Sequence, residues 1–181
     1  MKKDYPLLKS ERVFLAPLTE SDSPLLFKWI NDRELVQLNA PYRPISDAQH
    51  QAWFESIRKR NDVSIFGIRK YNPDTLIGSC QLLNINSISR NAELQIRIGE
   101  ASCRGQGLGH ESLRLLLSFG FNDLNLARIY LHVFSSNLVA CKVYKKLGFV
   151  CEGTLRKAVL INGEYEDVIV MGLLSEEYKN E

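Results

Sequence analysis

The spacing of apolar residues changes several times along the chain, and each spacing predicts a different element. Apolar and polar residues alternate through residues 91–98 and 127–134, which is the period of a strand with one buried face. Shorter apolar runs predict further strands at residues 11–18, 63–69, 76–83, 149–153 and 168–174. Residues 71–74, Tyr-Asn-Pro-Asp, predict the turn of an antiparallel hairpin between two of these strands.

Apolar residues spaced three and four apart predict four helices. The first follows Ser21 and Asp22, and the second follows Ser46 and Asp47, because these side chains can cap a helix N-terminus. The second helix is predicted to have one apolar face, formed by Ala48, Ala52, Trp53 and Ile57. The inner face of the third helix is predicted to contain Leu113, Leu116, Leu117, Gly120 and Phe121. A fourth helix is predicted at residues 138–147.

Strands come first in this order of elements, and a strand–helix–strand–helix–strand series follows. The order predicts an α/β (α+β) fold, in which a mixed sheet carries helices on both faces. The 181 residues suit one domain, 1–181, with a buried core. Hydrophobic residues at 45% and charged residues at 24% are ordinary for a globular protein.

Composition argues against several classes of function. A net charge of +2 gives no support for nucleic-acid binding, and no run of 18 apolar residues indicates a transmembrane helix. Residues 1–6 lack the apolar run of a secretory signal. Four cysteines without Cys-x-x-Cys spacing and three unclustered histidines do not favour a metal site. We therefore expect a cytoplasmic protein with free thiols and with no metal, nucleic-acid or membrane partner.

A glycine-rich segment, residues 103–110, lies between the strand at 91–98 and the third helix. Its glycines leave backbone N–H groups uncovered, and the helix N-terminus adds further N–H groups and a positive dipole end. Such a loop can hold a phosphate or pyrophosphate. It is not a P-loop, because His110 follows the last glycine, and the next strand lacks the acidic residue of a dinucleotide site. A glycine-rich connection without a ligand is the alternative.

Residues in and beyond this loop stand in the order found in the GNAT N-acetyltransferase superfamily. The residues that carry this resemblance are Arg104, Gly107, Gly109, Asn137, Tyr144 and the run Leu147-Gly148-Phe149. Segments 152–156 and 161–165 also resemble the branch with ribosomal-protein-alanine, spermidine and aminosugar N-acetyltransferases. The resemblance is clear from about residue 66 to residue 178. It implies a GNAT-type central sheet, mixed and mostly antiparallel, and acetyl-CoA as co-substrate.

The resemblance also implies which residues hold acetyl-CoA. Its pyrophosphate is expected on Arg104, Gly105, Gln106, Gly107, Leu108 and Gly109. Its pantetheine arm is expected to pair, like an added strand, with the backbone of Ile96, Arg97 and Ile98. One N–H group of that strand can also stabilise the thioester oxygen. Asn137 is expected to contact the arm through its amide, and its position after a strand also favours a helix cap.

Two residues are candidates for the proton transfers in amine acetylation. A tyrosine at the position of Tyr144 protonates the departing thiolate in this family, and a phenol with an ordinary pKa of about 10 carries a proton at neutral pH. Helical spacing alone would make Tyr144 a packing residue. In many GNAT enzymes a glutamate on the strand of Glu93 takes the amine proton, directly or through water. A structural ion pair between Glu93 and Arg97 is the alternative.

The expected acceptor is a primary amine, either a protein N-terminus or a small molecule such as an aminosugar or polyamine. By analogy, the wall of the acceptor site contains Trp29, Tyr42 and His50. Charges of both signs occur in that segment, whereas a polyamine site favours a more acidic wall. Direct attack in a ternary complex is the expected mechanism. A non-catalytic acyl-CoA sensor is the alternative function, and a homodimer is compatible with the resemblance.

Overall fold

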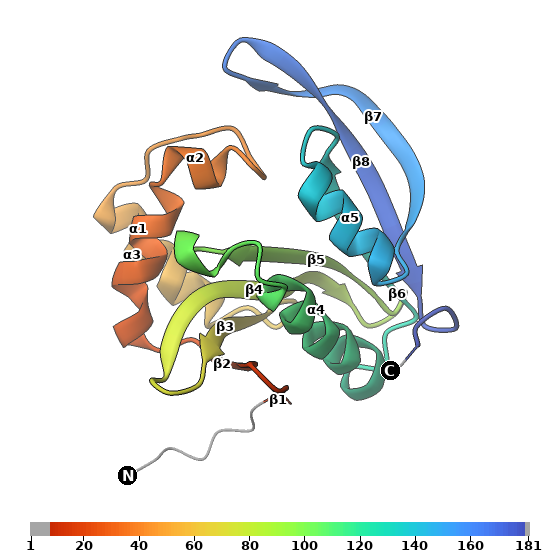
Figure 1. The fold of residues 1–181 in the computed structure, drawn as a ribbon, viewed down its shortest axis with the longest axis horizontal. Helices are drawn as coiled ribbons and strands as arrows, with labels where there is room; N and C mark the ends of the chain where they lie inside the picture. Colours follow the sequence, from red (N-terminus) through yellow and green to blue (C-terminus); the bar gives the residue numbers. More distant parts are fainter. Residues whose placement is uncertain (1–7, 180–181) are drawn as a thin grey trace.

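The computed structural model describes residues 8–179, which contain an eight-stranded sheet of order β1-β2-β3-β4-β5-β6-β8-β7 (Figure 1). The strands are β1 (Leu8–Lys9), β2 (Val13–Pro17), β3 (Ser64–Lys70), β4 (Thr75–Asn86), β5 (Asn91–Ile98), β6 (Arg128–Phe134), β7 (Val150–Ile161) and β8 (Glu164–Leu174). The helices are α1 (Ser23–Ile30), α2 (Arg33–Val36), α3 (Asp47–Ile57), α4 (Leu108–Ser118) and α5 (Leu138–Lys146). Residues 1–6, where no secretory signal was predicted, lie outside the described residues.

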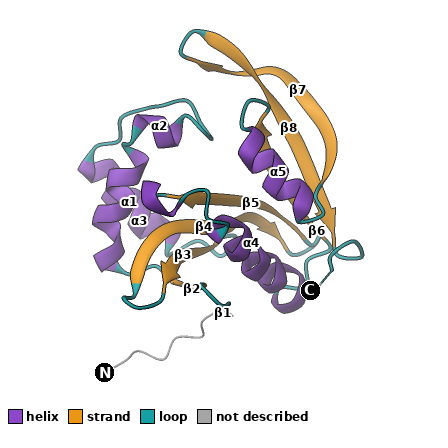
Figure 2. Cartoon of the chain, in the orientation of Figure 1, coloured by secondary structure: helices purple, strands orange, loops and turns teal. Residues whose placement is uncertain are grey.

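Neighbouring strands of the sheet are antiparallel except β5 and β6, which run parallel. Helices lie on both faces of this sheet (Figure 2). Ala92 and Leu94 of β5 are buried in the main core, which also contains the inner face of α4. Alternation along the strand therefore directs Glu93 and Arg97 to the opposite face, toward α1 and α3. The predicted mixed, mostly antiparallel sheet with helices on both faces is confirmed.

Strands β5 and β6 separate partway along their length. Their parallel pairing covers only residues 91–93 of β5, although both strands continue beyond this point. The N–H of Gly99 donates to the carbonyl of Ile77, so by alternation the backbone groups of Ile96 and Ile98 point away from β4. On that side, the second half of β5 has no strand partner among residues 8–179. It is an open edge to which an extended ligand can hydrogen-bond.

The inner face predicted for α4 is confirmed, since Leu113, Leu116, Leu117, Gly120 and Phe121 are all buried. The helix begins at Leu108, before the predicted start near His110, because Gly107 takes the N-cap position. Its close approach to the sheet depends on Gly120. A Cβ atom at this position would lie 2.7 Å from Cδ1 of Ile129.

The face predicted for the helix after Ser46 is wrong in part. His50, Phe54 and Ile57 are the buried residues of α3, whereas Ala48 and Ala52 are exposed. Small alanine side chains bury little apolar area, so larger residues on the neighbouring stripe determine how the helix rotates against α1. The predicted cap is confirmed, because the Ser46 hydroxyl accepts the N–H of Gln49.

The last two strands are longer than predicted. β7 and β8 continue to a turn at Asn162 and Gly163, whose φ angles of 51° and 86° suit a tight hairpin. Most of β7 is exposed, so it lacks the alternation that identifies a half-buried strand. Helix α2 was not predicted, since its four residues are too few for a periodic pattern. Among residues 8–179, no helix has the length and apolar character needed to cross a membrane.

Candidate active site

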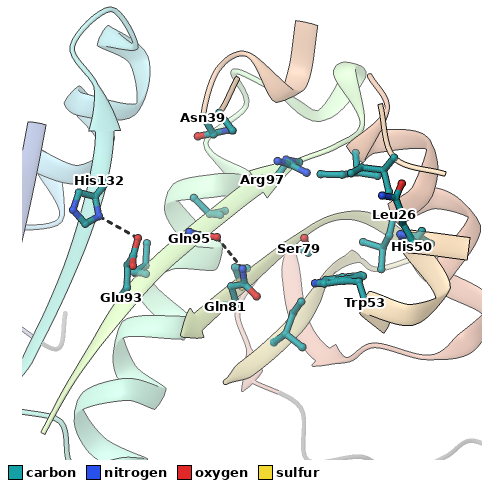
Figure 3. A pocket seen from close by; sticks show the side chains of 18 of the residues that line it. Leu26, Asn39, His50, Trp53, Ser79, Gln81, Glu93, Gln95, Arg97 and His132 are labelled. Atoms are coloured by element: carbon teal, nitrogen blue, oxygen red, sulfur yellow. Dashed lines mark hydrogen bonds and ion pairs between the residues drawn. The ribbon is translucent and has the colours of Figure 1, made fainter. Parts of the chain in front are cut away.

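A cavity of about 480 Å³ lies beside the open part of β5, on the face that α1 and α3 cover (Figure 3). Strands β4, β5 and β6 supply one side of its lining, and α1, α3 and the segment after α2 supply the other. Tyr144 of α5 also lines it. The cavity brings together Glu93, Tyr144 and His50, three predicted site residues that are far apart in the sequence.

Glu93 contacts His132 across the two separating strands. Its Oε1 atom lies 3.1 Å from Nδ1 of His132, and its Oε2 atom accepts a 3.3 Å hydrogen bond from Asn84. The side chain of Glu93 is 15% exposed and that of His132 is 40% exposed. The alternative pairing of Glu93 with Arg97 does not occur. Glu93 instead shares its carboxylate with a second group that can carry a proton.

Sequence reasoning did not identify His132 as a site residue. Glu93 is opposite Tyr130 in the parallel register, so His132 lies one strand period further along β6 on the same face. The alternating pattern of residues 128–134 already indicated which side chains face the core and which face the other side of the sheet. The missing information was the register between β5 and β6, which only the folded sheet supplies.

The Tyr144 side chain is 7% exposed, and its ring packs edge-on against Phe149 at 5.8 Å between centroids. Burial, followed by the neighbouring Cys141, raises the pKa of Tyr144 to about 12. The phenol therefore keeps its proton across the neutral range. Within residues 8–179 its hydroxyl has no hydrogen-bond partner, which leaves the O–H free to donate to a ligand in the cavity.

Backbone geometry leaves the glycine loop uncovered. Gly105 and Gly107 have φ angles of 73° and 79°, a left-handed conformation that other residues adopt at a cost. Gly107 caps α4 without a side-chain hydrogen bond, so N–H groups of the first turn are available to a ligand. Arg12 donates to the Gln106 carbonyl at 2.9 Å and to Glu111 at 2.7 Å. These contacts hold the loop against β2.

The side chain of Arg104 turns back to the sheet. Its Nε donates to the Ile98 carbonyl at 3.1 Å and its Nη2 donates to the Gly99 carbonyl at 2.7 Å. It therefore fastens the loop to the end of β5. Positive charge near the loop comes from α4 and α5: burial lowers the pKa of His110, and the nearby Arg114 and Lys146 lower it further.

Asn137 caps α5, as its position predicted. Its Oδ1 accepts the N–H of Ala140 at 3.2 Å. Its Nδ2 donates to the carbonyl of Leu38 at 3.1 Å, which ties the start of α5 to the segment after α2. Gln37 and Asn162 form a second link from this segment to the β7–β8 turn, at 2.8 Å. The second N–H of the Asn137 amide remains available to a ligand.

The three residues predicted for the acceptor wall lie in different environments. His50 lines the cavity, with Nε2 at 3.1 Å from both the hydroxyl and the carbonyl oxygen of Ser23. Trp29 is 2% exposed, packs inside the smaller core and donates to Glu100 at 3.3 Å. Tyr42 donates to the Asn31 carbonyl at 3.4 Å. Neither Trp29 nor Tyr42 lines the cavity.

Trp53 lines the cavity instead, beside His50 on α3. It was predicted as part of a buried face. An aromatic residue that stays 38% exposed next to a cavity is available for contact with a ligand. Spacing along a helix cannot separate a wall residue of this kind from a core residue, because both lie on the side that faces the protein.

No group of His, Cys, Asp and Glu in the described part of the chain could hold a metal ion. Cys80, Cys103 and Cys141 are buried free thiols, and Cys151 is an exposed one. Burial raises the pKa of Cys80 and of Cys141 above the ordinary value of a thiol. Because the thiolate is the nucleophilic form, these two environments disfavour acyl transfer through cysteine.

Comparison with known families finds a match to the acetyltransferase (GNAT) domain over residues 12–150. The spermidine N(1)-acetyltransferase of Vibrio cholerae serotype O1 is 42% identical over 105 residues, which cover 58% of this chain and 60% of the relative. The enzyme of the same name from Escherichia coli K12 is 39% identical over 101 residues, covering 56% and 54%. The chain thus spans less than two thirds of the length of these two relatives.

Other similarities extend over nearly the whole chain. A solved structure of spermidine N-acetyltransferase from Vibrio cholerae, in complex with CoA and spermine, is 32% identical. It covers 92% of this chain and 97% of its own, with a TM-score of 0.84. The uncharacterized N-acetyltransferase p20 of Bacillus licheniformis is 30% identical over 179 residues, covering 94% and 97%.

Proposed function

Because the chain belongs to the GNAT acetyltransferase family, we propose that it transfers the acetyl group of acetyl-CoA to a primary amine. One observation carries this proposal. The cavity beside the open edge of β5 contains both a carboxylate–imidazole pair, Glu93 and His132, and the free hydroxyl of Tyr144. These groups suit the two proton transfers that amide formation from an amine and a thioester requires.

Acetyl-CoA, which supplies the thioester, fits the residues around the cavity. We assign its pyrophosphate to the backbone N–H groups of residues 104–109, where Gly105 and Gly107 leave room for close approach. We assign its pantetheine arm to the unpaired backbone of residues 96–98 on the open edge of β5. Arg104 positions this loop through the Ile98 and Gly99 carbonyls. The Asn137 amide is the proposed contact on the β6 side of the arm.

The base in this mechanism is the Glu93–His132 pair. An ammonium has no lone pair, so the acceptor must lose a proton before or during its attack on the thioester carbonyl. The Glu93 carboxylate or the His132 imidazole accepts that proton, directly or through a water molecule. Their 3.1 Å contact lets the Glu93 carboxylate stabilise the positive charge that forms when His132 accepts the proton.

Tyr144 is the proposed acid. When the amine nitrogen bonds to the acetyl carbon, the carbon–sulfur bond breaks and the electron pair leaves with sulfur. The phenol O–H of Tyr144 gives its proton to that thiolate, and solvent restores the proton afterwards. A pKa raised to about 12 keeps the phenol protonated until the thiolate departs. Backbone N–H groups near Ile96 stabilise the charge on the carbonyl oxygen.

A small-molecule amine is the proposed acceptor, and a peptide N-terminus is the second choice. Two relatives and a structural neighbour carry the name of spermidine acetyltransferase, so spermidine is the first amine to test. His50 and Trp53, which line the cavity, are the proposed wall of the acceptor site. We further propose one domain, 1–181, acting in the cytoplasm, where acetyl-CoA is made and used. It has no metal, nucleic-acid or membrane partner, and a homodimer is compatible with this proposal.

The test measures release of CoA thiol from acetyl-CoA by the purified protein with a panel of amines. The panel contains spermidine, an aminosugar nucleotide, free amino acids and short peptides. Release that depends on an added amine is expected. Binding of acetyl-CoA without release on any amine would favour the acyl-CoA sensor, and absence of binding would overturn the assignment of the glycine loop.

A further inference from the structure

Arg97 is the arginine that lines the cavity, and it has no hydrogen-bond or ion-pair partner among the described residues. It extends from β5 on the same face as Glu93, and its Nε atom is buried without a hydrogen bond. Its guanidinium forms no ion pair within residues 8–179. In Figure 3 it points away from Glu93 and His132, toward the end of the cavity near Leu26.

A half-buried guanidinium with a buried, unpaired Nε atom is best stabilised by an anion. Burial lowers the pKa of Arg97, but an arginine remains charged in proteins, so the cation stays in a poorly solvated place. Another half-buried arginine shows the usual solution, since Arg69 pairs with Asp22 at 2.8 Å and with Asp74 at 2.5 Å. Arg97, which lines the cavity beside β5, lacks such a pair within residues 8–179.

The carboxylates nearest to Arg97 in sequence are already in use. Glu93 pairs with His132 and accepts from Asn84. Glu100 accepts the indole N–H of Trp29. No carboxylate within residues 8–179 pairs with Arg97, so an anion for it would come from a molecule that enters the cavity.

The rest of the lining supports the same conclusion. Glu93 is the one carboxylate among the nineteen lining residues, which are otherwise apolar, neutral and polar, or cationic. A polyamine bound there would place its second ammonium near Arg97 with no acidic group to compensate the repulsion. An amine that carries an anion would instead pair its two ends with Glu93 and Arg97.

We propose that the acceptor is a primary amine that also carries a carboxylate or phosphate, and that the guanidinium of Arg97 binds this anion. The proposal rests on the proposed acetyltransferase function and names its substrate class. The four-residue step from Glu93 to Arg97 separates their Cα atoms by about 13 Å in a strand. The proposed substrate therefore has several bonds between its amine and its anion. In a free α-amino acid, a single carbon separates the two groups.

The test compares three amines of similar length that differ in their far end, together with the longer polyamine spermidine. Thiol release is measured with 6-aminohexanoate, 5-aminopentyl phosphate, hexylamine and spermidine as acceptors. A kcat/KM at least tenfold higher for one of the two anionic amines than for hexylamine and spermidine is expected. The ratio between carboxylate and phosphate then identifies the anion.

Arg97→Gln and Arg97→Lys separate recognition from a structural role. Arg97→Gln is expected to reduce the kcat/KM ratio of the preferred anionic amine over hexylamine at least tenfold, mainly through KM. Arg97→Lys should keep part of that ratio, because the charge remains while the two-pronged geometry is lost. The affinity of each variant for acetyl-CoA, measured in parallel, shows whether the backbone of β5 is intact.

Other outcomes overturn the proposal in distinguishable ways. Equal or faster acetylation of spermidine or hexylamine would remove the anion from the substrate and leave the acetyltransferase function standing. An unchanged ratio in Arg97→Gln would remove Arg97 from recognition. Release with none of these four amines would overturn this proposal, and the wider panel of amines would then decide separately whether the protein is an acetyltransferase.

Discussion

Nδ1 of His132 lies 3.1 Å from Oε1 of Glu93, just beyond the point where β5 and β6 separate. The two residues are 39 positions apart, and each comes from one side of the opening between the strands. An open strand edge and a proton-accepting pair therefore meet in one place (Figure 3). The mechanism proposed for this protein depends on that coincidence.

Tyr144→Phe is expected to lower kcat at least tenfold, because the departing thiolate loses its proton donor. The affinity for acetyl-CoA, measured by calorimetry, should change little, since the ring and its packing against Phe149 are kept. Tyr165→Phe, which changes an exposed phenol on β8, serves as the control. Full activity of Tyr144→Phe would exclude Tyr144 from the mechanism.

Glu93→Gln is expected to lower kcat/KM about a hundredfold or more at neutral pH, because the proton acceptor is removed while the shape is retained. The rate of this variant should then rise with pH as more of the amine is neutral in solution. His132→Asn should show a smaller loss with the same trend if Glu93 is the primary acceptor. Matching pH profiles of Glu93→Gln and the unaltered protein would contradict the assignment.

Tyr144 also predicts how stability changes at high pH. Its pKa is raised to about 12 in the folded protein, against about 10 in the unfolded chain. The unfolded state therefore releases this proton first, and stability that is complete below pH 10 is lost as pH rises toward 12. A two-unit shift corresponds to about 3 kcal/mol of unfolding free energy.

Urea unfolding between pH 9 and 12 measures this loss. The unaltered protein should lose more stability over the range than Tyr144→Phe, in which the titrating group is absent. Subtracting the two curves removes the contribution of the other tyrosines. Parallel curves would show that the Tyr144 phenol ionises equally easily in the folded and unfolded states.

Gly107→Ala is expected to raise the KM for acetyl-CoA severalfold. Its φ of 79° is left-handed, and a side chain there costs about 1 to 2 kcal/mol, which the loop can relieve by moving its N–H groups. Gly153→Ala is the matched control, because an added Cβ meets nothing within 4 Å and no positive φ is required. An equal KM in both variants would argue against the loop as the pyrophosphate site.

Local patterns predicted much of the fold because their causes act over a few residues. The start of α3 follows from a single serine, and the cap of α5 follows from Asn137. The strands at residues 91–98 and 128–134 follow from a period of two residues. The inner face of α4 follows from a spacing of three and four residues. The length of β7 was missed, since an exposed strand leaves no such period.

The sequence likewise predicted some residues of the candidate site and missed others. Glu93, Tyr144 and the loop were predicted from residue type and order along the chain, and the structure brings Glu93 and Tyr144 to one cavity. Of the residues predicted for the acceptor wall, His50 lines the cavity and Trp29 lies in the core, whereas Trp53, which was not predicted there, lines the cavity. Both tryptophans lie on helices that face the sheet. The packing of α1 against α3 buries Trp29 in the core and leaves Trp53 at the cavity.

The sequence by itself determined the family, the glycine loop and the helix that carries Tyr144, because short-range propensities and fixed spacings encode them. Only the tertiary structure decided that His132 reaches Glu93 and that Arg97 faces a cavity without a counterion. Both depend on the register and separation of β5 and β6 and on the helices that close the other side. Such contacts join residues far apart in the chain, and their geometry exists only after the backbone has been brought together.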